Sequence, residues 1–371
     1  MLEVLAEIYN KFVFDKLYVL LLLSFIISYI LVPPIILISK KLKLGDKGGG
    51  RKIHKKVIPT LGGIAIIISF MVSLLAWSPN FSIETNFKNN EFLFGGISVL
   101  ILLIVGVRDD LIPIKSLVKL IVQILTAFIV VVFGKLYFTD FNGLFGLEVI
   151  PIFYGKLLCI FIIVAIVNAY NLIDGIDGLA SVMAMISSLF FAMWFILGNN
   201  IVMYSIAISL FGSLLGFLMF NKSPAKIFMG DTGSMFVGFI LAILAIRFIA
   251  FNSIVKDSYL HVENAPLIAM TTMLVPVLDV IRVFVDRLLA KKSPFYPDKS
   301  HIHHLLLKIG FSHNMVVSLL GGLSVTFIFI SVLFNDKLSF LVFIFMCLVF
   351  IGISIGIKYM IIGKIKKIRN S

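Results

Sequence analysis

Residues 155–197 read GKLLCIFIIVAIVNAYNLIDGIDGLASVMAMISSLFFAMWFIL, and this stretch decides the fold. Two long apolar runs flank a short turn that is rich in Asn, Asp and Gly. Each run is close to the length of about 20 residues that a helix needs to cross a bilayer. The stretch therefore predicts two membrane-spanning helices that meet in a polar turn at the membrane surface.

The rest of the chain has the same apolar character. Of its 371 residues, 60% are hydrophobic and 14% are charged, and the mean hydropathy is +1.11. A soluble domain has about 45–50% apolar and about 25% charged residues. The composition therefore excludes a soluble globular protein, a disordered chain and a secreted disulfide scaffold. Cys159 and Cys347 lie in apolar runs and are interpreted as small core residues. The predicted fold class is all-α, a polytopic integral membrane protein.

Eleven apolar segments are predicted to span the membrane. They are 17–38, 57–77, 92–107, 117–138, 155–173, 179–197, 200–220, 227–250, 265–286, 315–334 and 338–362. Most Lys and Arg fall in the loops of one side, which identifies that side as cytoplasmic and places the N-terminus outside and the C-terminus in the cytoplasm. This asymmetry accounts for the net charge of +13 without a nucleic-acid partner. We expect one transmembrane domain, 1–371, with an active site on the cytoplasmic loops 39–60, 106–119, 168–180, 221–235 and 279–314.

An adjacent pair, Asp109 and Asp110, ends the third predicted span in VGVRDDLIPIKSLVKL (105–120). A charged Asp within the membrane costs about 2.5–3.5 kcal/mol, which favours a function over a solvated helix cap. Because adjacent helical residues point about 100° apart, the two are not expected to be equivalent. We expect Asp109 to face an acceptor that enters from the membrane, and Asp110 to hold a cation, a lysine or the backbone.

The segment NAYNLIDGIDGLA (168–180) is the most informative motif. Its polar residues Asn168, Asn171, Asp174 and Asp177 recur every three positions, which would place them down one side of a helical turn. The glycines between them loosen the backbone and let a ligand approach closely. The alternative is two helix caps around a tight turn, which would not need two Asn and two Asp in register.

A third motif, IFMGDTGSMFVGF (227–239), opens the eighth predicted span. A helix N-terminus with small residues suits a phosphate or its counter-cation. Asp231 on its own could be an N-cap. Together with the other aspartates it is a candidate ligand for Mg²⁺, which prefers one or two carboxylates plus phosphate oxygens and waters.

The longest cytoplasmic loop carries His301, His303 and His304. Zinc would require Cys or carboxylate ligands at conventional spacing, which are missing nearby, so the candidates are solvated histidines or donors to a polyphosphate. Just before this loop, Arg282 lies between Asp279 and Asp286. This arrangement indicates either an ion-pair network or a phosphate anchor.

Aspartates on several segments of one face, a histidine cluster and basic loops together indicate a Mg²⁺-dependent site for phosphates at the membrane surface. The predicted reaction class is phosphoryl transfer, in which positioning and charge neutralisation supply most of the catalysis. A membrane transporter of an anionic substrate is the alternative from another class. A transporter would usually place its acidic residues near the membrane midplane on broken helices, whereas here they lie at one face.

These motifs, in this order, resemble the polyprenyl-phosphate N-acetylhexosamine-1-phosphate transferases, from RKIHKKVIPTLGG (51–63) to HIHHLLLKIG (301–310). That family transfers a sugar-1-phosphate from a UDP-N-acetylhexosamine to undecaprenyl phosphate, releases UMP and requires Mg²⁺ or Mn²⁺. The resemblance implies a bacterial cytoplasmic-membrane enzyme whose active site faces the cytoplasm, in lipopolysaccharide, teichoic acid or other cell-wall synthesis. A homodimer is left open.

The histidine segment resembles the GlcNAc-1-phosphate branch. The phospho-MurNAc-pentapeptide transferases are expected to have three consecutive histidines, whereas this chain has HIHH (301–304). The pentapeptide enzyme is the alternative within the family, and the choice of aminosugar stays open. By motif, the resemblance implies catalytic roles for Asp109, Asp110, Asp174 and Asp177, a metal ligand in Asp231, and contacts to nucleotide or sugar phosphate from Asn168, Asn171, Phe228, Lys55, Lys56, Arg282, His301, His303 and His304.

We predict that chelation by EDTA abolishes activity and that Mg²⁺ or Mn²⁺ restores it. The reason is that the cytoplasmic aspartates offer hard oxygen ligands without thiolates. The measurement is product formation before chelation, after chelation and after metal is added back. Full activity in metal-free buffer would contradict the assignment.

Overall fold

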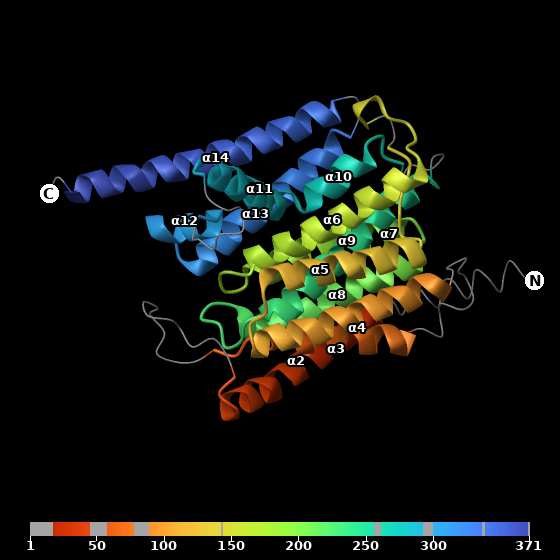
Figure 1. The fold of residues 1–371 in the computed structure, drawn as a ribbon, viewed down its shortest axis with the longest axis horizontal. Helices are drawn as coiled ribbons and strands as arrows, with labels where there is room; N and C mark the ends of the chain where they lie inside the picture. Colours follow the sequence, from red (N-terminus) through yellow and green to blue (C-terminus); the bar gives the residue numbers. More distant parts are fainter. Residues whose placement is uncertain are drawn as a thin grey trace, which may run out of the picture.

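The computed structural model describes residues 18–44, 58–77, 89–141, 144–255, 261–291, 300–335 and 338–369, which are built almost entirely of helices (Figure 1). The helices that carry the bundle are α2 (Tyr18–Lys41), α3 (Gly62–Trp77), α4 (Asn89–Leu111), α5 (Ser116–Phe128), α6 (Ile152–Ile173), α7 (Leu179–Leu197), α8 (Ile201–Asn221), α9 (Gly230–Asn252), α10 (Ala265–Thr272), α11 (Leu274–Leu289), α12 (Ile302–Ile309), α13 (His313–Leu333) and α14 (Ser339–Arg369). Between α5 and α6 lie the π-helical turn η2 (Ile129–Phe133) and the short 3₁₀ helix η3 (Leu144–Gly146).

The prediction of an all-α polytopic membrane protein is confirmed. In the described part of the chain, nine helices are long and apolar enough to cross a membrane, and the number is ten if the bent pair α10 and α11 is one span. The shorter apolar helix α3 falls in the predicted segment 57–77. The total of eleven spans and their orientation remain predictions.

The segment 265–286, predicted as one span, is broken: α10 and α11 meet at an angle of 78°. Pro276 accounts for the break, because a proline has no N–H for the carbonyl four residues earlier, that of Thr272. The hydroxyl of Ser187 on α7 donates to that Thr272 carbonyl instead, at 2.7 Å. A hydrogen bond from a neighbouring helix thus replaces the one that the proline removes, as a membrane interior requires.

The helices lie side by side along the long axis of the molecule, with α8 and α9 near the middle (Figure 1). These two are the most buried of the spans. Helix α2 packs along α8, and α3, α4 and α6 all pack along α9. Helix α9, which carries the third aspartate motif, is therefore the element against which the helices of the other two motifs, α4 and α6, are aligned.

Glycines allow these helices to approach closely, as is common where the surrounding lipid gives no hydrophobic force for packing. A Cβ at Gly63 of α3 would lie 2.2 Å from the backbone nitrogen of Gly233 on α9. A Cβ at Gly238 of α9 would lie 2.7 Å from the Cα of Val167 on α6. The atoms that each added Cβ would meet are backbone atoms, so the close spacing of the helices requires glycine, which has no side chain.

We predict that Gly63→Ala lowers the thermal stability of the purified protein. The added methyl group would meet the α9 backbone, and overpacking of this kind costs about 1–3 kcal/mol. Gly95→Ala in α4 is the matched control, because a Cβ there meets nothing within 4 Å. Thermal unfolding in detergent compares the two variants, and equal midpoints would show that α3 can shift without cost.

Candidate active site

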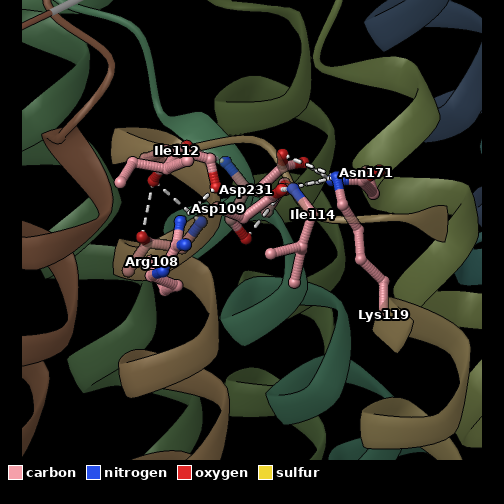
Figure 2. Close-up of polar contacts among 10 residues, drawn as sticks. Arg108, Asp109, Ile112, Ile114, Lys119, Asn171 and Asp231 are labelled. Carbon is pink, nitrogen blue, oxygen red and sulfur yellow. Dashed lines mark hydrogen bonds and ion pairs between the residues drawn. The ribbon is translucent and has the colours of Figure 1, made fainter.

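Four helices bring together, at one end of the bundle, Asp109 of α4, Lys119 of α5, Asn171 of α6 and Asp231 of α9 (Figure 2). The ammonium group of Lys119 forms ion pairs with the carboxylates of both Asp109 and Asp231, the second at 2.9 Å. The amide nitrogen of Asn171 donates to Asp231 and, at 2.9 Å, to the hydroxyl of Ser234. These residues come from distant parts of the sequence and form the centre of the site.

The two adjacent aspartates at the end of α4 point to different partners. The buried Asp109 accepts a hydrogen bond from the backbone of Ile114 at 2.7 Å and pairs with Lys119. Asp110 accepts three hydrogen bonds from the first turn of α9. The expected difference between the two is therefore visible in their contacts, while their roles in catalysis remain predictions.

Asp231 is not an N-cap, which was the competing interpretation. Helix α9 begins at Gly230, its N-cap position is Met229, and no side chain of that position caps it. Asp231 lies in the first turn and directs its carboxylate to Lys119 and Asn171 (Figure 2). The carboxylate of Asp231 thus faces other helices, with Asn171 at Oδ1 and Lys119 at Oδ2, and its contact with a metal remains a prediction.

The expectation that four polar residues share one side of a helix is wrong for the last two. Helix α6 ends at Ile173, and Asp174 and Asp177 lie in the turn that follows. The backbone turns at Gly178, whose φ of 77° favours glycine. The helical period therefore stops before Asp174, and the two aspartates take separate directions.

Asp174 joins the central cluster. Burial raises its pKa well above the usual value, and the nearby carboxylates of Asp231 and Asp110 raise it further, while the backbone of Gly230 donates a hydrogen bond. Asp109, Asp110, Asp174 and Asp231 thus gather with one compensating charge within the described residues, that of Lys119.

Asp177 lies outside this cluster and connects the turn after α6 to neighbouring segments. Its carboxylate accepts from the backbone of Ala225 at 3.1 Å and faces Nδ1 of His313 at 3.4 Å. Nearby, the side chain of Asn221 accepts from Gly178 and Ser181. Asp177 and Asn221 fix the turn after α6 to the loop that leads into α9.

The histidine segment is attached to α11 through Asp279. Its carboxylate accepts a hydrogen bond from the backbone of Ile302 at 2.9 Å, lies 2.9 Å from Nδ1 of His301 and pairs with Arg282 at 2.7 Å. Arg282 also donates to Asp286 at 3.1 Å and to the carbonyl of Ser300. The contacts of Arg282 in this state are those of the ion-pair network, and a phosphate contact remains a prediction.

His303 is fully buried and lies against the turn after α6. A Cβ at Gly175 would be 2.6 Å from its Nε2. Burial lowers the pKa of His303 to about 3, and the neighbouring His304 contributes to this. The ring is therefore neutral at physiological pH.

The other predicted site residues lie apart from the centre or outside the described residues. Asn168 lies one helical turn deeper than Asn171 and donates to Gln123 at 2.6 Å. Phe228 is half-buried, and its backbone nitrogen donates to the carbonyl of Pro59 at 2.8 Å. Lys55 and Lys56 lie outside the described residues.

Lys119 was not among the residues singled out from the sequence. The available signal was a lysine ten residues after Asp109 within an apolar helix, where an ionisable residue is expensive and usually functional. From the sequence alone, Lys119 is instead counted among the basic residues of the predicted cytoplasmic loops. Its partner Asp231 is far away in the sequence, so the pair required the structure.

The donor set fits a hard divalent cation. Among the described residues, no group of three or more His, Cys, Asp or Glu is arranged to hold a metal by itself. Mg²⁺ does not need such a cage, since one or two carboxylates with phosphate oxygens and waters suffice. Asp231 is the carboxylate proposed for that role, with Asp174 near it, and binding of Mg²⁺ remains a prediction.

We predict that Asp279→Asn destabilises the protein far more than Asp286→Asn and weakens catalysis with it. Asp279 is 2% exposed, and removing one partner of a buried ion pair costs about 3–5 kcal/mol. Asp286 is about one-third exposed, and such pairs contribute about 0–1 kcal/mol. Thermal unfolding and steady-state kinetics compare the variants, and equal losses would show that Asp279 does not organise the histidine segment.

Comparisons with known proteins identify the family of the chain. A family model described as "Glycosyl transferase family 4" matches residues 92–249, which run from α4 into α9. A Bacillus subtilis (strain 168) protein named "Probable undecaprenyl-phosphate N-acetylglucosaminyl 1-phosphate transferase" is 34% identical, with 82% of each chain covered. The Mycobacterium tuberculosis (strain ATCC 25618 / H37Rv) "Decaprenyl-phosphate N-acetylglucosaminephosphotransferase" is 31% identical, over 79% of this chain and 76% of its own.

A third relative, the Escherichia coli (strain K12) "Undecaprenyl-phosphate alpha-N-acetylglucosaminyl 1-phosphate transferase", is 28% identical over 76% of this chain and 74% of its own. All three similarities extend over most of both chains. The resemblance indicated by the sequence motifs is therefore confirmed, and the chain belongs to glycosyl transferase family 4.

Proposed function

We propose that this protein transfers N-acetylglucosamine-1-phosphate from UDP-N-acetylglucosamine to a polyprenyl phosphate and releases UMP. The observation that carries the proposal is the cluster of four aspartates and Lys119, drawn from α4, α5, α9 and the turn after α6, at the end of a membrane bundle. The names of the relatives support the sugar and the lipid. Undecaprenyl phosphate is the proposed acceptor.

The location follows from the same proposal. The chain is a multi-pass membrane protein, and its relatives are bacterial. We infer that it resides in the bacterial cytoplasmic membrane with the aspartate cluster facing the cytoplasm, where the basic loops are predicted to lie. There a soluble UDP-sugar and a membrane lipid can reach one site from different sides.

In the proposed reaction, a phosphate oxygen of the lipid attacks the β-phosphorus of the UDP-sugar in line. The bond from that phosphorus to the oxygen bridging the two phosphates breaks, and UMP leaves with the bridging oxygen. A bound Mg²⁺ would neutralise phosphate charge, and Asp231, oriented by its hydrogen bond from Asn171, would hold it. Lys119 would face the phosphates, and Asp109 would orient the acceptor. Positioning and charge neutralisation account for most of the catalysis in phosphoryl transfer.

The histidine segment would bind the donor through hydrogen bonds. Asp279 is bonded at Nδ1 of His301, and the pKa of His303 is lowered to about 3. A neutral imidazole still offers one donor and one acceptor. We propose that this segment orients the diphosphate, and that Phe228 contacts the uracil ring.

We predict that the purified protein releases UMP from UDP-N-acetylglucosamine when undecaprenyl phosphate and Mg²⁺ are both present. A panel of other UDP-sugars identifies the donor, and omission of the lipid is the control for hydrolysis. Asp231→Asn should lower kcat by more than about tenfold, equivalent to about 1.4 kcal/mol, with a smaller change in the KM for the donor.

Asp286→Asn is the matched aspartate control, because its partners Arg282 and Lys358 lie outside the cluster. It should retain most of the activity. Uptake of substrate into vesicles without UMP release would contradict the proposed reaction. Greater activity with another UDP-sugar would correct the donor alone.

A further inference from the structure

Helix α9 is capped by a residue from a different helix. Its first-turn N–H groups have no acceptor within the helix, as at every helix start. Oδ1 of Asp110 on α4 accepts from the backbone of Asp231 at 2.8 Å, and Oδ2 accepts from the backbone of Thr232 at 3.1 Å. The hydroxyl of Thr232 donates to the same Oδ2 at 2.5 Å. One carboxylate therefore satisfies two backbone groups and a side chain at the start of α9.

Two glycines make this close contact possible. Gly230 has a φ of 73°, and a Cβ there would lie 2.6 and 2.7 Å from the two oxygens of Asp110 and 2.0 Å from the carbonyl of Thr60. A Cβ at Gly106, one helical turn before Asp110, would lie 2.5 Å from the Cα of Thr232. The backbones of α4 and α9 meet at the point where the cap forms.

The cap contacts Asp231, the residue that the proposed function assigns to the metal. The backbone N–H of Asp231 is one of the capped groups, and its side-chain carboxylate faces Lys119 and Asn171. Fixing the backbone of Asp231 therefore limits where its carboxylate can lie. Asp109, the neighbour of Asp110, contacts the other side of the same lysine.

We propose that Asp110 is a positioning residue that caps α9 from another helix and holds Asp231 in place, without touching the substrate or the metal. The inference rests on the proposed function for its catalytic consequence. Asp110 already accepts three hydrogen bonds, and an ionised carboxylate has about four acceptor sites, so little capacity is left for a ligand. Asp109 and Asp110 thus have different partners: Asp109 pairs with Lys119, and Asp110 accepts hydrogen bonds from the backbone of α9.

Substitution by asparagine separates this role from direct catalysis. Asn and Asp cap helices about equally well, whereas Ala caps poorly. In Asp110→Asn, the side-chain carbonyl could accept from the backbone of Asp231, and the side-chain amide could donate to the Thr232 hydroxyl. A general base or a metal ligand, by contrast, loses its function with the charge. The positioning role therefore predicts that Asp110→Asn has a kcat and a hydrogen-exchange rate between those of the wild type and those of Asp110→Ala.

The experiment measures hydrogen exchange and kinetics on the same detergent-solubilised variants. Without substrate or metal, the peptide containing Asp231 and Thr232 should exchange fastest in Asp110→Ala and at an intermediate rate in Asp110→Asn. With donor, acceptor and Mg²⁺, kcat should fall about 100-fold in Asp110→Ala, as for a misplacement of about 1 Å, and about tenfold or less in Asp110→Asn.

A second pair of variants keeps the test decisive if Asp110→Ala does not fold. Thr232→Val removes the hydroxyl donor and should speed exchange of the same peptide, whereas Thr232→Ser keeps the donor and should restore protection and rate. An Asp110→Asn variant as inactive as Asp231→Asn, with wild-type exchange of the α9 peptide, would overturn the proposal and make Asp110 a ligand or base. Because exchange needs no substrate, wild-type protein that protects this peptide but releases no UMP would refute the proposed function and leave the cap intact.

Discussion

The ammonium group of Lys119 lies between carboxylates from two helices that are far apart in the sequence, and the site depends on this contact. Asp109 on α4 and Asp231 on α9 carry like charges. Two unit charges about 4 Å apart interact by about 4 kcal/mol at an effective dielectric constant of about 20, so without a cation the helix ends would repel each other. The lysine permits the aspartates to stay together before any ligand arrives.

This electrostatic contact is possible because the backbones already lie close together. Gly106 of α4 meets Thr232, and Gly63 of α3 meets Gly233, both at the start of α9. The same region of α9 receives the Asp110 cap. Where lipid supplies no hydrophobic force between helices, small residues and hydrogen bonds set the packing. The position of Asp231 is thus a consequence of how three neighbouring helices pack on α9.

The features that could be predicted from the sequence are those that depend on the local pattern of residues. The helices of the fold follow from apolar runs of sufficient length, and the ends of those runs placed Asp109 and Asp231 at one face. The break before Leu274 follows from Pro276, which the sequence contains, but the hydroxyl that satisfies the freed carbonyl of Thr272 comes from Ser187 on another helix. Asp174 and Asp177 were assigned a common helical face because their spacing fits a helix, whereas the backbone leaves the helix at Ile173.

The distribution of charge in the site limits how a diphosphate can be bound. The charge of Arg282 is directed to Asp279 and Asp286, and burial keeps His303 neutral by lowering its pKa to about 3. His303 therefore offers hydrogen bonds to a donor without positive charge. Beside it, the aspartates of the cluster share Lys119 as their cation among the described residues, so ionised carboxylates there would repel a free diphosphate. The proposed reaction resolves this conflict if the nucleotide and the cation are bound together, because each supplies the charge that makes the other's binding favourable.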